Sequence, residues 1–297
     1  MCNMTVTLDE PTTANLLPCV NWKGRQITRL VLGHNPIKGW SHCGTELDKE
    51  MKAWFNPEAG HDLSIVQRAE ACGINTCQFG GPTMHDLLHR YKAAGGQNQW
   101  IATLYDSGSD WNPGAPSFEE ELKAILAVDP KPIGIQNFGE NSDRYFITDN
   151  MPRLQEKLKR FRDTGLLVGV CSHLPEVVEY IEERNWDIDF YQTCFYTVYS
   201  LANERRIDRA HEIYDDAARE RMVKFIRRTR KPCMAFKVLK ANRFCSTDDA
   251  VRGALKFALD NIKETDAICV GMWDKYKDQV SQNAGFVRDI LREKARR

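Results

Sequence analysis

Short apolar runs alternate along this chain with longer amphipathic ones. Eight apolar runs have the length and continuity of strands covered on both faces, and they begin at Ile27, Ile74, Gln99, Lys131, Gly165, Asp187, Lys231 and Asp266. Between and after them, apolar residues recur three and four positions apart, as in "HDLSIVQRAEACG" and "MPRLQEKLKRFRDTG". This spacing predicts helices, so the chain consists of eight strand–helix units.

Eight regular units predict an α/β fold, a single (β/α)8 TIM barrel that spans residues 1–297 as one domain. A doubly wound open sheet is the rival arrangement, but the regular repetition favours closure. Residues 20–26, "VNWKGRQ", predict an N-terminal hairpin that plugs the end of the barrel opposite the active face. Two long loops, residues 36–60 after the first strand and 196–212 after the sixth, lie on the strand-to-helix side. Loops of this length are typical of lids and binding loops.

Composition narrows the partner to a small molecule. The 297 residues carry 41 Lys and Arg against 41 Asp and Glu, so the formal net charge is zero and no basic stripe indicates nucleic acid. The N-terminal residues lack the pattern of a signal peptide, and no run approaches the roughly 20 apolar residues of a membrane span. Ten cysteines occur without a C-x-x-C pair, which indicates reduced thiols and a cytoplasmic protein. The sequence is compatible with a homo-oligomer and does not decide the oligomeric state.

Several motifs resemble those of the aldo/keto reductase superfamily. They are "KGRQITRLVLG" at the first strand, "EACGINTCQF" at the second, "IATL" at the third, "VGVCSHLPEVVEYI" at the fifth, and "ALKFALDNIKETDAICVGM" with "KDQVSQNAGFV" at the end. The resemblance covers most of the chain and implies the barrel. It also implies NADPH-dependent carbonyl reduction with an Asp, Tyr, Lys and His set.

This chain departs from that set at each position. Gln78 stands where the family has Asp, Leu104 where it has Lys, and Asn137 or Phe138 where it has His, while the Tyr-bearing turn is absent. A Gln cannot hold a lysine's charge, and a Leu cannot lower the pKa of a tyrosine. The resemblance therefore supports the fold of a divergent member and argues against ordinary reductase chemistry.

Polar side chains at the carboxyl ends of the predicted strands are the candidate site. The predicted catalytic residues are Lys237, His173 and Asp106, and the predicted substrate-binding residues are His34, Asn35, His42, Gln78, Gln136, Asn137, Arg243 and Trp273. Amides and charges read hydroxyl groups, and aromatic rings cover the apolar face of a sugar. The set therefore favours a small carbohydrate-like or oxo-sugar substrate.

Lys237 interrupts the apolar run "CMAFKVL", where burial would lower its pKa toward that of a useful base or Schiff-base amine. The alternative is an ion pair with Asp106 or Glu140. His173 would be the partner acid, and His42 would reach the site with its loop. A divalent metal on His34, His42, His173 and Glu140 is a weak alternative, because these residues are scattered over four loops.

The leading hypothesis is an enzyme of lyase, isomerase or hydratase type that performs acid–base chemistry beside a carbonyl. The second is an NAD(P)H-dependent carbonyl oxidoreductase with a relocated proton donor such as Lys237 or His173. Lys275, Lys277 and Gln279 could meet an anion at the start of the last helix, and a solvated polar face explains them equally well. The third is a non-catalytic ligand-binding barrel. No cofactor is required by the sequence, and the substrate's identity is not encoded in these patterns.

Overall fold

A computed structural model describes residues 16–106, 116–198 and 212–296. Eight parallel strands close into a barrel in the order β10-β3-β4-β5-β6-β7-β8-β9. The strands are β3 (Leu30–Gly33), β4 (Thr76–Phe79), β5 (Gln99–Leu104), β6 (Gly134–Asn137), β7 (Leu167–Ser172), β8 (Phe190–Cys194), β9 (Cys233–Phe236) and β10 (Ala267–Gly271). The predicted single TIM barrel is confirmed.

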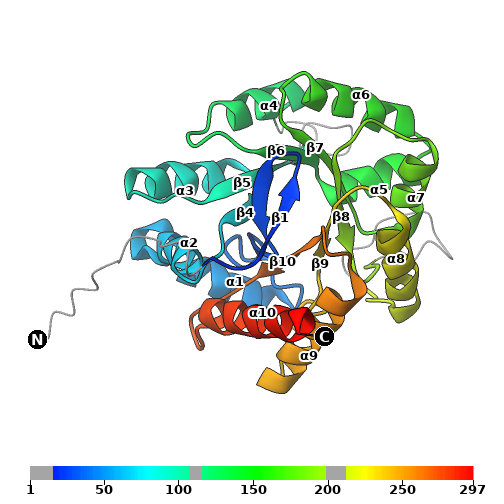
Figure 1. The fold of residues 1–297 in the computed structure, drawn as a ribbon. Coiled ribbons are helices and arrows are strands. Elements are labelled where there is room, and N and C mark those ends of the chain that lie inside the picture. Colours follow the sequence, from blue (N-terminus) through cyan, green and yellow to red (C-terminus); the bar gives the residue numbers. More distant parts are fainter. Residues whose placement is uncertain (1–15, 107–115, 199–211, 297) are drawn as a thin grey trace, which may run out of the picture.

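Helices form a ring outside the barrel, as Figure 1 shows. One helix precedes each following strand or closes the chain: α2 (His61–Ala71), α3 (Pro82–Ala93), α4 (Phe118–Leu126), α6 (Met151–Arg162), α7 (Pro175–Glu183), α8 (Asp216–Arg228), α9 (Asp248–Asn261) and α10 (Gln279–Ala295). The main hydrophobic core lies between these helices and the strands, as the 3.6-residue spacing predicts.

A two-stranded antiparallel hairpin, β1 (Cys19–Trp22) and β2 (Arg25–Thr28), covers one end of the barrel (Figure 1). Trp22 stacks on Phe190 of β8 with ring centroids 5.3 Å apart. A Cβ at Gly169 would lie 2.2 Å from the Phe190 ring, so the glycine makes room for this stack. Apolar side chains of the hairpin and the strands fill this end, and the hairpin is the plug that the sequence predicts.

The first predicted strand was too long. Residues Ile27 and Thr28 belong to the hairpin, and the barrel strand β3 begins only at Leu30. Arg29 separates the two, because its backbone N–H donates to the Pro18 carbonyl and its guanidinium donates to the carbonyls of Lys263 and Glu264. One continuous apolar run therefore serves two elements.

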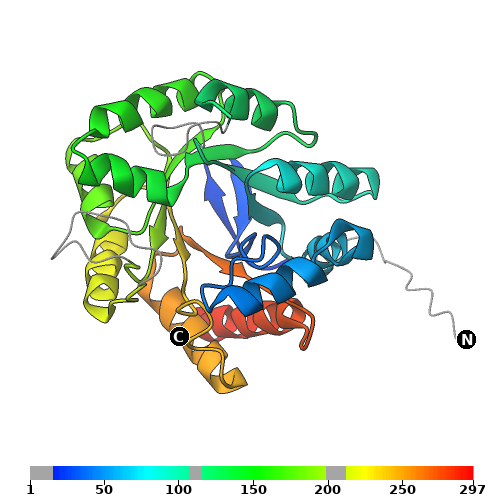
Figure 2. The ribbon, with the colours of Figure 1, turned by 180° about the vertical axis from the view of Figure 1, so that it is seen from behind.

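Three further elements lie on the strand-to-helix side. The segment after β3 forms α1 (Thr45–Trp54) and a short 3-10 turn (Pro57–Ala59), and α5 (Gly139–Ile147) follows β6. Figure 2, the view from behind, shows α1 at the end of the barrel away from the hairpin. The predicted loop 196–212 falls largely on residues 199–211, which lie outside the described residues. Residues of α1 and α5 line the cavity at this end of the barrel.

Candidate active site

One cavity of about 2140 Å³ opens at the carboxyl ends of the barrel strands. Most of the predicted site residues line it: His34, Asn35, His42, Gln78, Asp106, Gln136, His173, Arg243, Lys237, Trp273 and Glu140. Because parallel strands end at the same face, residues far apart in sequence converge there. Asn137 is absent from the lining. Its amide donates to Ser142 Oγ at 3.2 Å and to the Phe138 carbonyl at 3.3 Å, so it supports the start of α5.

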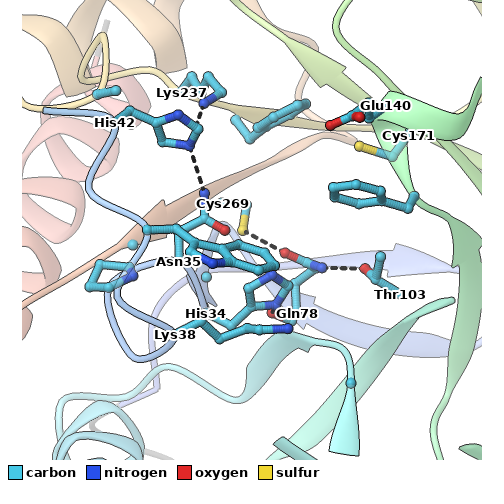
Figure 3. Close-up of a pocket in the computed structure, with 18 of the residues that line it drawn as sticks. His34, Asn35, Lys38, His42, Gln78, Thr103, Glu140, Cys171, Lys237 and Cys269 are labelled. Carbon is cyan, nitrogen blue, oxygen red and sulfur yellow. Dashed lines mark hydrogen bonds between the residues drawn. The ribbon is translucent and has the colours of Figure 1, made fainter. Parts of the chain in front are cut away.

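Lys237, His42 and Glu212 form a chain of polar contacts, of which Figure 3 shows the link between Lys237 and His42. The Lys237 Nζ lies 2.8 Å from His42 Nε2, and His42 Nδ1 lies 2.9 Å from Glu212 Oε1. Tyr214 donates its hydroxyl to Glu212 Oε2 at 2.7 Å. A carboxylate beside Nδ1 holds the ring proton there, so Nε2 accepts a hydrogen bond from the lysine amine.

Burial and charge set the protonation of this chain. Burial lowers the pKa of Lys237, and it lowers the pKa of His42 despite the hydrogen bond to Glu212. Burial alone would raise the pKa of the Glu212 carboxyl, but the hydrogen bond from His42 and the nearby Lys237 bring it down to about 2. The carboxylate is thus ionised, and the amine is shifted toward its neutral, nucleophilic form.

The backbone around the site occupies an unusual region. Lys237, His42 and Asp106 have φ angles of +56°, +58° and +50°. Side chains other than glycine pay an energetic penalty in this left-handed region, and such residues cluster at active sites. All three residues line the cavity.

His173 is oriented by a buried carboxylate. Its Nδ1 lies 2.8 Å from Asp143 Oδ2. Asp143, in α5, is fully buried and also accepts hydrogen bonds from the Ser172 hydroxyl at 2.5 Å and from the His173 backbone N–H at 3.2 Å. The imidazole lines the cavity, so an Asp–His pair presents Nε2 as an acid–base group.

A tyrosine lies between a lysine and a histidine near α3. Lys38 Nζ donates to the Tyr105 hydroxyl at 3.0 Å, and that oxygen lies 3.2 Å from His34 Nε2. His34 Nδ1 contacts the Gln78 carbonyl at 3.0 Å, which places the ring proton on Nδ1. Burial lowers the pKa of Lys38 to about 8 and that of His34 to about 3, and burial raises the pKa of Tyr105. The phenol is therefore a proton donor beside a readily titrated amine.

Two predicted carboxylates are committed to ion pairs elsewhere. Asp106 pairs with Lys157 and accepts the Tyr145 hydroxyl at 2.7 Å. Glu140 pairs with Arg144 at 2.7 Å. The alternative reading of Lys237, as the partner of Asp106 or Glu140, is therefore wrong. The catalytic role predicted for Asp106 also loses its basis, because its carboxylate already binds a buried ammonium.

The metal alternative finds no assembled ligand set. Within the parts of the chain that the structure describes, no group of three His, Cys, Asp or Glu side chains is placed to hold an ion. His42 and His173 each direct Nδ1 at a carboxylate, and His34 directs Nδ1 at a backbone carbonyl. The three imidazoles thus belong to three separate contacts.

The start of α10 does not fit a dinucleotide phosphate. Lys275 pairs with Glu50, and Lys277 pairs with Asp248. The Asp278 carboxylate caps the helix by accepting the Ser281 N–H at 3.0 Å, and Gln279 accepts the Trp273 N–H at 2.8 Å. A phosphate there would meet carboxylates and cations that are already neutralised. The cofactor-binding role expected for Lys275, Lys277 and Gln279 is not supported by these contacts.

Sequence reasoning missed Lys38, Tyr105, Asp143 and Glu212. Lys38 lies in the predicted loop 36–60, and Tyr105 precedes the predicted Asp106 by one position. Asp143 belongs to α5, which was not expected. Glu212 closes the second long loop. Only the positions of these residues near strand ends signalled them, since their partners come from distant segments.

Comparison with known proteins gives only low similarity. No family model matches the chain, and no curated protein matches it in sequence. Structural similarity extends to a Schiff base forming fructose-1,6-bisphosphate aldolase at 14% identity, covering 89% of this chain and 93% of that one with a TM-score of 0.47. It also extends to an aldo-keto reductase from a Medee basin deep-sea metagenome library, at 12% identity, 91% and 93% coverage and a TM-score of 0.45.

A sugar phosphate isomerase/epimerase from Parabacteroides distasonis is similar as well, at 12% identity, 87% and 93% coverage and a TM-score of 0.45. Likeness at this level concerns the barrel and says nothing of the reaction, because one barrel supports many chemistries. Membership of the aldo/keto reductase superfamily therefore stays a prediction. Among the described residues, no helix has the length and apolar character to cross a membrane.

Proposed function

We propose that this chain is a barrel enzyme that acts on a small, polar, carbohydrate-like carbonyl compound, with Lys237 as its reactive amine. One observation carries the proposal. The Lys237 amine lies in the cavity 2.8 Å from His42 Nε2, and no carboxylate of the described residues pairs with it. A partly buried ammonium without a direct ion pair is costly, whereas a neutral amine beside an acceptor nitrogen is a nucleophile.

The arrangement supports formation of a Schiff base. The Lys237 nitrogen attacks the carbonyl carbon of the substrate, and the amine proton passes to His42 Nε2. Glu212 stabilises the resulting imidazolium through Nδ1. That proton then goes to the carbinolamine oxygen, and a second proton, taken up from solvent through His42, lets this oxygen leave as water as the protonated C=N bond forms. The protonated imine draws electrons from the adjacent carbon, which favours isomerisation or C–C cleavage there.

His173 supplies a second acid–base group. Its Nδ1 contacts the buried Asp143 at 2.8 Å, and the residue lines the cavity. We assign it the proton that is removed from or returned to the carbon beside the carbonyl. Aromatic side chains in the lining, Trp40 and Trp273 among them, suit the apolar face of a sugar.

Trapping with borohydride tests the proposal. The protein is incubated with dihydroxyacetone, reduced with sodium borohydride, and mapped by peptide mass spectrometry. The expected result is one secondary-amine adduct on Lys237, which Lys237→Met abolishes. Lys49→Met, at a side chain that is 72% exposed and outside the cavity, is the matched control and keeps the adduct. Adducts that persist in Lys237→Met or spread over surface lysines would contradict the proposal.

A carbonyl oxidoreductase is the second candidate, and the contacts of Tyr105 favour it. A phenol held by the Lys38 amine and the His34 imidazole could donate its proton to a carbonyl oxygen as hydride arrives. The neutralised start of α10 disfavours it. Titration with NADPH, followed by tryptophan fluorescence, separates the candidates: saturable quenching supports the oxidoreductase, and unchanged fluorescence at millimolar cofactor excludes it.

A further inference from the structure

Four polar side chains from four strands form the floor of the cavity. Gln78 (β4), Thr103 (β5), Gln136 (β6) and Gln192 (β8) line the cavity and are 6%, 3%, 0% and 3% exposed. Nearer the hairpin the barrel interior is apolar. Interior layers of such barrels consist mostly of branched apolar residues, so a polar layer at the cavity needs a reason.

Glutamine amide N–H groups donate the hydrogen bonds of this floor. Gln136 Nε2 donates to Thr103 Oγ1 at 3.0 Å and also to Gln192 Oε1. Gln78 Nε2 donates to the same Thr103 oxygen, as the dashed line in Figure 3 marks. Two N–H groups therefore point at one hydroxyl oxygen and occupy both of its acceptor positions.

Two hydrogen-bonding capacities are left over at adjacent positions. Thr103 must direct its own hydroxyl proton elsewhere, and among the described residues none accepts it. Gln136 Oε1 is buried and has no hydrogen-bond partner. Because Oε1 shares its carbon with the Nε2 that contacts Thr103, the spare donor and the spare acceptor lie close together. A buried carbonyl oxygen without a partner is costly, so this pair calls for a group that both accepts and donates.

We propose that Thr103 and Gln136 form a subsite for one hydroxyl group of a polyhydroxylated ligand. The hydroxyl accepts the Thr103 proton and donates its own proton to Gln136 Oε1. A hydroxyl matches both roles at once, whereas a carboxylate or phosphate has no proton to donate and a methyl group satisfies neither. The inference shares with the proposed function only the assumption that the substrate binds in this cavity. The hydrogen bonds of the subsite do not involve Lys237.

The subsite also orients the substrate. Thr103 of the subsite lies apart from Lys237 and His42 in the cavity (Figure 3). A ligand that places a hydroxyl on Thr103 and Gln136 therefore has its far end available to the lysine. The substrate class this favours is a hydroxylated carbonyl compound of several carbons.

A pair of carbonyl-free probes tests the subsite. 1,4-Butanediol and 1,4-difluorobutane share a four-carbon chain, and in the second both hydroxyls are replaced by fluorine, which cannot donate a hydrogen bond and accepts one poorly. Neither forms a Schiff base, so failure of the proposed function cannot alter the result. Affinities are measured by saturation-transfer NMR. We expect the native protein to bind the diol more tightly, and Gln136→Met to reduce that preference roughly three- to tenfold, the effect of one ordinary hydrogen bond.

Matched variants separate the subsite from a loss of structure. Asn283→Leu removes another buried amide whose Oδ1 lacks a partner, but one outside the cavity lining, and it should keep the preference. Thr103→Val should lose the preference, and Thr103→Ser, which restores the hydroxyl, should regain it. The two Thr103 variants test the subsite if Gln136→Met fails to fold. Equal binding of both probes by the native protein, or a preference that survives in Thr103→Val, would overturn the inference.

Discussion

Replacing Asp106 by Asn tests whether this residue is structural. Its side chain is 3% exposed and pairs with Lys157, whose side chain is 7% exposed. Tyr145 joins them, donating to Asp106 at 2.7 Å and accepting from Lys157 at 2.6 Å. The substitution preserves shape and removes only the charge, so the Lys157 ammonium stays buried without its counter-ion.

Breaking one side of a buried pair costs about 3–5 kcal/mol, because the remaining charge is desolvated and unpaired. A domain of ordinary stability, about 5–15 kcal/mol, still folds with that loss. For a chain of this size we expect the melting temperature to fall by about 5–10 °C. Urea unfolding followed by circular dichroism gives the free energy of unfolding directly, and borohydride trapping at Lys237 should be retained.

Two comparisons make this reasoning refutable. Asp106→Asn combined with Lys157→Met should lose less stability than the sum of the single variants, because the double variant leaves no orphan charge. Glu119→Gln breaks an exposed pair with Arg160 and should leave the unfolding midpoint unchanged. If Asp106→Asn unfolds like the native protein but no longer forms the Lys237 adduct, Asp106 acts on the ligand and our assignment is wrong.

Three further predictions concern the plug and the two lysine clusters. Trp22→Ala removes the stack on Phe190 and should cost about 3–5 kcal/mol in urea unfolding while Lys237 trapping persists; a smaller loss would mean the hairpin is dispensable. His42→Gln removes the proton acceptor and should slow adduct formation at Lys237 by about a hundredfold, measured by quenched time courses, whereas an unchanged rate would remove His42 from the proposal. Lys38, with a pKa of about 8, should be acetylated above that pH and lose reactivity as pH falls through 8, because protonation blocks the amine; a midpoint near 10.5 in a site-resolved labelling profile would refute it.

Periodicity was enough to predict the barrel. Runs covered on both faces, separated by helical spacing and repeated eight times, leave few arrangements that bury every strand. The bounds of β3 were less accessible, because the same apolar run continues through the hairpin and its break at Arg29 depends on carbonyls from residues 263 and 264. The hydrophobic pattern around Arg29 contains no information about hydrogen-bond partners that are more than 200 residues away.

The sequence predicted which end of the barrel carries the site, but it did not predict which residues contact one another there. Their positions at strand ends identified Lys237 and His173 as cavity residues, since all parallel strands end on one face, and the loop after the first strand identified His42. Their partners were not visible: Glu212 and Asp143 come from a long loop and an unexpected helix. Asp106 illustrates the opposite error, because a carboxylate at a strand end looks free until Lys157 of α6 is placed beside it.

The reactivity of Lys237 as a function of pH shows whether its amine is neutral and nucleophilic near neutral pH. Competitive acetylation with site-resolved mass spectrometry gives the fraction of neutral amine at each pH between about 6 and 11. Burial disfavours the ammonium form of Lys237. We therefore expect the midpoint of its acetylation profile at a pH well below the ordinary lysine pKa of 10.5, with reactivity retained as pH falls toward neutrality. A midpoint at or above 10.5 would show a charged, unreactive lysine and would contradict the account.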